Sequence, residues 1–168
     1  MDSKRIIIIG CCGSGKSTLA RQINQKMDIP IVHLDQLFWR SNWQHISDDE
    51  FDRLLQDELK KDNWIIDGNY NHSLQKRFEY ADTVIYLDYS RIICIWGIVK
   101  RVIKNHGRTR PDMSENCPEK FDFEFLKYTW NFNKKYHSSN MEIIKNCDNK
   151  TIYIFKNRRQ CNQFLESI

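Results

Sequence analysis

The pattern of hydrophobic and polar positions changes its period repeatedly along this 168-residue chain. Residues 6–9 are four consecutive isoleucines, which is typical of a strand buried on both faces of a parallel sheet. Comparable apolar runs predict further strands at 31–35, 64–68, 83–88 and 151–156. Between these runs, apolar residues recur at helical spacing. Strands that alternate with helices predict an α/β fold, a three-layer arrangement in which helices flank a five-stranded parallel sheet.

Local capping signals delimit the helices. Ser47 with Glu50 forms a capping box, and Ser90 and Asp122 are candidate N-caps for two later helices. The predicted helices cover 15–27, 47–61, 72–80, 91–106 and 122–147, with a short one at the C-terminal end. A polar stretch at 107–121 holds two of the chain's three prolines, and we expect it to be a small lid. We expect one domain over 1–168, with a substrate-binding insertion at about 36–62.

Composition narrows the function classes. Hydrophobic residues make up 40% and charged residues 29%, and no apolar run approaches the length of a membrane span. No cleavage site of a signal peptide is evident, so we expect a cytoplasmic protein without a membrane partner. The six cysteines form no C-x-x-C pair, which favours free thiols. A net charge of +4 fits a protein that binds an anionic substrate better than one that binds nucleic acid. We expect a monomer or a homodimer.

The segment after the first strand matches G-x-x-x-x-G-K-[ST], the phosphate-binding loop of nucleoside triphosphatases. Loop amides and the N-terminus of the following helix favour a bound anion. Lys16 is expected to bridge the β- and γ-phosphates, and Ser17 to bind magnesium. The predicted site for ATP and Mg2+ comprises Gly10, Cys11, Cys12, Gly13, Ser14, Gly15, Lys16, Ser17 and Thr18.

The two loop cysteines allow two interpretations. Cys11 and Cys12 occupy wild-card positions, where small side chains simply fit. A thiol near a helix N-terminus can also have a lowered pKa, so sensitivity to alkylation stays open.

Carboxylates follow several of the predicted strands. Asp67 ends one strand and Asp35 ends another, and the carboxyl ends of parallel strands meet at the ligand cleft. We expect Asp67 to share the magnesium ion with Ser17, with Gly68 beside it at the substrate. Asp35 is expected at the acceptor. Helix capping or a solvated turn is the alternative, and it is strongest for Asp88.

Basic and aromatic residues complete the predicted site. Lys100, Arg101, Arg108 and Arg110 lie in or before the polar loop and suit a lid that closes over transferring phosphates. Arg77 is a candidate for the acceptor side. Trp39 and Trp43 either line an acceptor pocket or stack on a base, or they pack between small helices, and the sequence leaves these alternatives open.

The motifs "GCCGSGKSTLARQI", "IVHLDQLFW", "WIIDGNY", "ADTVIYLDYSR", "GRTRPDM", "CPEKFDFEFLKYTWNF" and "FKNRR" occur in this order. In order and spacing they resemble the FlaR-type "DNA topology modulation" proteins, which look like adenylate-kinase-like P-loop kinases. The resemblance spans nearly the whole chain and implies a P-loop NTPase fold like that of nucleoside monophosphate kinases.

The resemblance also implies roles for particular residues. "DG" in "WIIDGNY" is similar to the start of the adenylate kinase D-G-F-P-R motif, which supports Asp67 at the magnesium ion. "NYN" replaces "FPR", so the arginine that grips the acceptor phosphate is missing there, and Arg77 is a candidate substitute. Asp35 falls where shikimate and gluconate kinases hold an acceptor hydroxyl. The segment "FKNRR" resembles the one that borders adenine in these kinases, which makes Arg158 a candidate to stack on the base.

These observations predict an ATP-dependent kinase for a small acceptor, either a nucleoside or nucleotide or a hydroxylated metabolite. The expected catalytic residues are Lys16, Asp35, Arg101, Arg108 and Arg110. The alternative is a nucleotide-binding regulator that affects DNA topology without kinase activity. A GTPase-like switch ranks last, because the chain has no N-K-x-D guanine motif.

Overall fold

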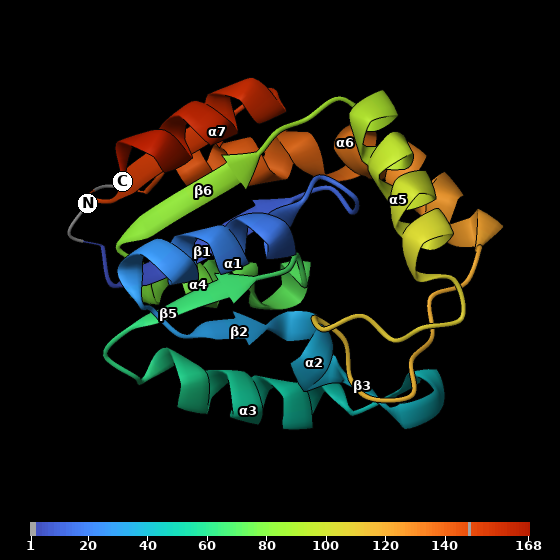
Figure 1. Ribbon diagram of the computed structural model, residues 1–168. Helices are drawn as coiled ribbons and strands as arrows, with labels where there is room; N and C mark the ends of the chain where they lie inside the picture. Colours follow the sequence, from blue (N-terminus) through green and yellow to red (C-terminus); the bar gives the residue numbers. More distant parts are fainter. Residues whose placement is uncertain (1–2, 148) are drawn as a thin grey trace.

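The computed structural model describes residues 3–147 and 149–168, which form a five-stranded sheet between two layers of helices (Figure 1). All neighbouring strands in this sheet pair in parallel, in the order β2-β5-β1-β6-β7. The strands are β1 (Arg5–Gly10), β2 (Ile31–His33), β5 (Trp64–Asp67), β6 (Thr83–Leu87) and β7 (Thr151–Phe155). The predicted five-stranded parallel sheet is confirmed. Its carboxyl ends therefore share one edge.

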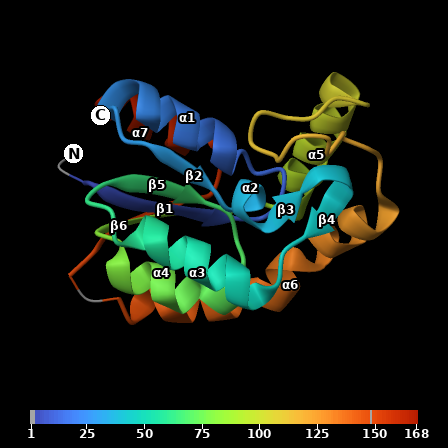
Figure 2. The same ribbon diagram turned by 90° about the horizontal axis from the view of Figure 1, so that it is seen from below.

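The isoleucines of β1 supply both faces of the core. Ile6 and Ile8 pack with residues of α1 (Lys16–Met27) and α7 (Arg158–Ser167). Ile7 and Ile9 pack with residues of α3 (Asp48–Leu59), α4 (Leu74–Tyr80) and the C-terminal part of α6 (Phe123–Lys145). Figure 2 shows the two helical layers on opposite sides of the sheet. The continuous isoleucine run is needed because neither face of β1 meets water; all four side chains are at most 1% exposed.

Two of the three predicted N-caps make the expected hydrogen bond. The Glu50 amide donates to Ser47 Oγ (3.2 Å) at α3, and the Phe125 amide donates to Asp122 Oδ1 (3.0 Å) at α6. Ser90 precedes α5 (Arg91–Asn105), but its side chain makes no capping hydrogen bond.

The predicted strand at 31–35 is too long. The chain leaves the sheet at His33 and enters α2 (Leu34–Phe38), so Asp35 lies in the first turn of a helix instead of at a strand end. Leu34 is fully buried beside Gly68, and a carboxylate in the first turn of a helix is electrostatically favourable. A small hairpin of β3 (Trp39–Arg40) and β4 (Gln44–His45) around η1 (Ser41–Trp43) follows.

The segment 106–121, between α5 and α6, folds over the segment 36–43. Gln36 Nε2 donates to the Pro111 carbonyl (2.7 Å), and Ser114 Oγ donates to the Trp39 carbonyl (2.5 Å). The Asn42 amide donates to the carbonyl of Asn116 (3.0 Å). These contacts bring two stretches that are distant in sequence together above the carboxyl edge of the sheet (Figure 1). None of the helices in the described ranges has the length and apolar character needed to cross a bilayer.

Candidate active site

The loop between β1 and α1 has the backbone of an anion cradle. Gly13 and Gly15 adopt φ angles of 76° and 103°, a region that side chains disfavour. Lys16 Nζ donates to the carbonyls of Gly10 (2.9 Å) and Cys11 (3.1 Å), which holds the ammonium across the loop. Ser14 Oγ is buried and has no hydrogen-bond partner. An orphaned hydroxyl and a helix N-terminus in this loop fit a bound phosphate group.

A close contact with α5 fixes the shape of this loop. A Cβ atom on Gly13 would lie 2.2 Å from the Cys94 carbonyl oxygen, and one on Gly97 would lie 2.0 Å from the carbonyl oxygen of Gly13. Both positions therefore require glycine. The helix that leads to the 106–121 segment is thus packed directly on the phosphate loop.

The surroundings of the two loop cysteines raise their thiol pKa values instead of lowering them. The neighbouring Cys94 thiol, with burial, raises the pKa of Cys11, whose Sγ donates to the Thr129 carbonyl (3.6 Å). Burial also raises the pKa of Cys12, and the positive charge of Lys16 offsets this only in part. A raised pKa favours the neutral thiol, which is the less nucleophilic form.

Asp67 lies where it was predicted, at the end of β5, and it is 4% exposed. In the strand register it faces His33 of β2, and the two side chains share a hydrogen bond. Burial alone would lower the pKa of His33, but the hydrogen bond and the charge of Asp67 outweigh it and raise that pKa. His33 was not a predicted site residue. Its only sequence signal is a polar residue in an apolar strand.

Asp35 accepts a hydrogen bond from Tyr70, in the loop that follows β5. Tyr70 Oη donates to Asp35 Oδ1 (3.0 Å), and Tyr70 itself has a φ of 32°, in the left-handed region. Burial raises the pKa of Asp35, although this hydrogen bond and the charge of Arg110 pull in the opposite direction. The Phe51 ring stacks on that of Tyr70, with centroids 4.9 Å apart. Tyr70 was also missed, and only its place in "DGNY" could have indicated it.

Arg77 lies beneath the 68–70 loop and is fully buried. Its guanidinium donates to the carbonyls of Gly68 (2.9 Å) and Tyr70 (3.1 Å) and also to that of Asn69. Burial lowers its pKa to about 9. The side chain therefore supports the loop that carries Tyr70.

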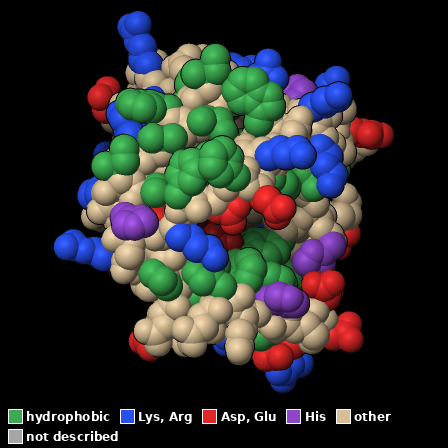
Figure 3. All heavy atoms as spheres, turned by 90° about the vertical axis from the view of Figure 1, so that its right-hand side faces the viewer, with side chains coloured by type: hydrophobic (Ala, Val, Ile, Leu, Met, Phe, Trp, Pro, Cys, Tyr) green, Lys and Arg blue, Asp and Glu red, His purple; other side chains and the backbone are tan. Residues whose placement is uncertain are grey.

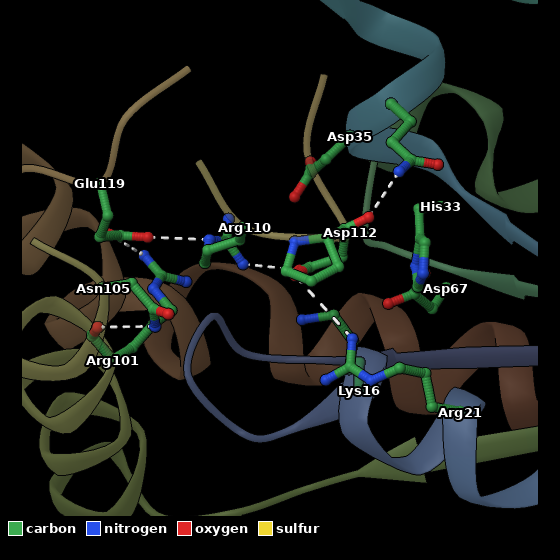
Figure 4. A network of polar contacts seen from close by, with 12 residues as sticks. Lys16, Arg21, His33, Asp35, Asp67, Arg101, Asn105, Arg110, Asp112 and Glu119 are labelled. Carbon is green, nitrogen blue, oxygen red and sulfur yellow. Dashed lines mark hydrogen bonds and ion pairs between the residues drawn. The ribbon is translucent and has the colours of Figure 1, made fainter. Parts of the chain in front are cut away.

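Ion pairs connect the 106–121 segment to α5 and to α1, the helix that follows the phosphate loop (Figure 4). Arg110 contacts Asp112 (Nη1–Oδ2, 2.6 Å) and Glu119 (Nε–Oε2, 2.8 Å). Glu119 also accepts a hydrogen bond from Arg101 (3.0 Å), and Arg21 of α1 lies 3.9 Å from Asp112. Burial would raise the pKa of Asp112, but the charge of Arg110 and a hydrogen bond from Ser17 are among the effects that hold it below its usual range. Asp112, Glu119 and Arg21 were not predicted site residues.

The other predicted residues lie at the margin of this network. Arg108 and Arg158 are exposed, as is Thr18 at the start of α1. Trp39 and Trp43 are half-buried and pack edge to face, with ring centroids 5.5 Å apart. Outside the network, the carboxylate of Asp88 pairs with His137 (3.1 Å) and Lys156.

The donor set fits a magnesium nucleotide. Ser17 and Asp67 offer a hydroxyl and a carboxylate, and magnesium prefers oxygen ligands. Among residues 3–147 and 149–168, no group of three or more His, Cys, Asp and Glu side chains is arranged to hold a metal ion by itself. Such an ion would therefore need phosphate oxygens and water as its further ligands, which is usual for magnesium.

No family model matches the chain. No curated protein matches it either. Among solved structures the chain is similar to shikimate kinase from Bacteroides thetaiotaomicron, with a TM-score of 0.57 and 16% sequence identity. The match covers 98% of this chain and 95% of that chain. At this identity the likeness shows the fold, which is that of a P-loop kinase.

Proposed function

We propose that this protein is an ATP-dependent kinase that transfers the γ-phosphoryl group to a hydroxyl of a small molecule. The observation that carries the proposal is the convergence of Lys16, Asp35 and Arg110 around one space at the carboxyl edge of the sheet (Figure 4). A phosphoryl transferase needs cations around the transferred group and an acceptor group on its far side. The three residues come from the phosphate loop, α2 and the 106–121 segment, and their proximity supports the proposal.

The phosphate loop would hold the donor. Amides near Gly13 and Gly15 would bind the β-phosphate, and Lys16 would stabilise charge on the transferring group. Ser17 and Asp67 would hold Mg2+. When bound, this ion would neutralise negative charge on the phosphates. His33 fixes the orientation of the Asp67 carboxylate through their shared hydrogen bond.

Asp35 would orient the acceptor hydroxyl and accept its proton. The hydroxyl oxygen forms a bond to the γ-phosphorus, the bond from that phosphorus to the bridging oxygen of ADP breaks, and the proton moves to Asp35. A carboxylate with a raised pKa is a better proton acceptor than an ordinary one. The Arg77 guanidinium already donates hydrogen bonds to backbone carbonyls, so it is not placed to bind a phosphate group of the acceptor. This favours an acceptor that is bound through hydroxyl groups.

The 106–121 segment, which contains the lid predicted at 107–121, would act as the lid. It carries Arg110, and Glu119 ties Arg110 to Arg101 of α5, so that both guanidinium groups approach the phosphate loop from one side. A lid of this kind stabilises developing charge and excludes water that would otherwise hydrolyse the donor. The proposal further assigns exposed Arg108 to the phosphates and Arg158 to adenine.

An acceptor screen tests this function. The full chain with ATP and Mg2+ is assayed for ADP release over nucleosides, nucleotides, sugar acids and polyols, with Lys16→Ala as the blank. We expect ADP release that requires one acceptor class and is lost in the blank. ADP release at the same rate without any acceptor would make the protein an ATPase and overturn the proposal.

We further propose, from the order of the quoted motifs, that the chain belongs to the FlaR-type group. The alternative function for this chain is nucleotide-dependent regulation of DNA topology without kinase activity. Such a regulator would bind duplex DNA with a steep dependence on salt concentration. A gel-shift experiment across salt concentrations, run beside the acceptor screen, separates the two functions.

A further inference from the structure

Large hydrophobic side chains are exposed on one side of the molecule. All such residues in the described ranges belong to α5 or to the segment 121–130, and their exposed fractions run from 38% to 78%. They are Ile92, Trp96, Ile103, Phe121, Phe123, Tyr128 and Trp130. Figure 3 shows hydrophobic side chains gathered over this side, with basic side chains between them. On α6, Tyr128 lies about half a turn away from Trp130 and is therefore on a different side of the helix. We call the other six residues the α5–α6 face.

The face is built from two adjoining stripes. Ile92, Trp96 and Ile103 recur at helical spacing along α5, and Phe123 and Trp130 are separated by two turns of α6. Near the end of α5, the guanidinium of Arg101 lies 5.5 Å from the Phe125 ring, and near its beginning that of Arg91 lies 4.3 Å from the Trp130 ring. The helices therefore run antiparallel and side by side, so the stripes form one surface.

The size of this surface fits a protein interface. With the areas usual for aromatic and aliphatic side chains, the six residues present roughly 800 Å² to solvent. The largest apolar patch of a typical monomer is about 300–600 Å². A standard stable interface buries about 800 Å² of each partner. The α5–α6 face is therefore large enough to hold two chains together.

Each end of the face carries a charged residue that a second copy of the chain could pair with. Arg91 lies at the end with Trp130, whereas Asp122 and Glu124 flank Phe123 at the opposite end, where Lys104 and Lys120 are also exposed. A two-fold axis through the middle of the face brings the Arg91 end of one copy onto the Glu124 end of the other. An anionic lipid surface would instead be repelled by Asp122 and Glu124, although α5 itself contains four basic residues and no acidic one.

We propose that the α5–α6 face binds a second copy of this chain in a two-fold dimer, with Arg91 of each copy near Glu124 of the other. The phosphate loop is not covered by this arrangement, because it packs against Cys94, Gly97 and Ile98 on the opposite side of α5. The dimer is independent of the proposed kinase activity. In this dimer, the α5 and α6 helices of the two copies lie between the two phosphate loops.

Sedimentation of the full chain from about 1 to about 100 µM tests the dimer. We expect a dimer, and we expect Trp96→Glu to weaken its dissociation constant by at least about tenfold, because a charge is placed at the centre of the interface. Gln75→Glu is the matched control, since Gln75 is exposed on α4, away from the face, and it should leave the dimer unchanged. Circular dichroism confirms that both variants are folded.

A charge exchange tests the two-fold arrangement. Arg91→Glu and Glu124→Arg are each expected to weaken the dimer by about tenfold, and the double variant is expected to restore it. A double variant no better than either single one would overturn this pairing. A wild-type chain that is monomeric at the highest concentration would overturn the dimer, as would a monomer that cosediments with vesicles containing phosphatidylglycerol.

Discussion

At the scale of single residues, Lys16 and Arg110 carry most of the proposed charge stabilisation. Lys16→Ala and Arg110→Ala are each expected to lower the rate of phosphoryl transfer by about 100-fold or more. Lys16 makes two hydrogen bonds to loop carbonyls, so its loss should cost only about 1 kcal/mol of unfolding free energy. ADP release and urea unfolding measure the two effects. Wild-type turnover in either variant would contradict the mechanism.

The pH dependence of transfer reports on Asp35. A general base must be deprotonated, so kcat/KM should rise with pH through the pKa of Asp35. Because burial raises that pKa, the acid limb is expected above the ordinary carboxyl value of 3.8. Asp35→Asn should remove the limb and lower the rate by about 100-fold. pH profiles of kcat/KM for the two proteins check this.

Tyr70→Phe serves as the matched control for this assignment. The Tyr70 hydroxyl stabilises the Asp35 carboxylate, so its removal should raise the pKa of Asp35 further and move the acid limb to higher pH. An acid limb at the same pH in Tyr70→Phe would show that a different group titrates.

Arg77 distinguishes a structural role from acceptor binding. Arg77→Met is expected to lower the free energy of unfolding by about 3 kcal/mol or more, because three loop carbonyls lose a buried donor. Arg77→Lys should restore little, since an ammonium cannot reproduce the planar fork. Urea unfolding is the measurement, with Lys76→Ala on the same helix as the control. Unchanged stability with weaker acceptor binding would instead support a role at the acceptor.

At the scale of elements, the regular parts of the fold could be predicted and the irregular parts could not. Four isoleucines define β1, and Ser47 and Asp122 cap helices, because these signals are local. The boundary at His33 and the hairpin that follows depend on the packing of Leu34 in the core, which no local pattern records.

The same distinction holds within the site. The residues of the phosphate loop follow from their motif, whereas His33 and Tyr70 become site residues only through partners that are more than 30 positions away. Glu119 owes its place to the folding of the 106–121 segment. Arg77 was predicted as a candidate for the acceptor side, and its full burial beneath the 68–70 loop could not be read from its residue type.

The contact between α5 and the phosphate loop gives a prediction at this scale. Gly97→Ala would normally stabilise a helix interior by up to about 1 kcal/mol. Here the added Cβ would lie 2.0 Å from the Gly13 carbonyl oxygen, so we expect lower stability and nucleotide affinity weakened by about tenfold. Thermal unfolding and titration with ATP check both effects. Lys104→Ala, at an exposed position of the same helix, should change neither, and a stabilised Gly97→Ala variant would refute the contact.

At the scale of the whole molecule, the site is assembled by two segments that close over one edge of the sheet. The 106–121 segment is held to α2 and η1 by hydrogen bonds that its backbone carbonyls accept, and to α1 by the carboxylate of Asp112. Hydrogen bonds to backbone carbonyls do not depend on charge, whereas the Asp112 contacts do. The position of the lid over the phosphate loop should therefore change when the charge of the Asp112 carboxylate is removed.

Asp112→Asn tests whether that carboxylate keeps the lid closed. The pKa of Asp112 is lowered, so its ionised contacts with Arg110 and Arg21 persist at neutral pH and are lost only as pH falls below the ordinary carboxyl range. Without the charge, the lid should open more often, and trypsin should cleave after exposed Arg108 several times faster. Glu115→Gln removes an exposed charge from the same segment and should leave the cleavage rate unchanged. Equal cleavage rates in Asp112→Asn and wild type would mean that the backbone contacts to the 36–43 segment are sufficient to hold the lid.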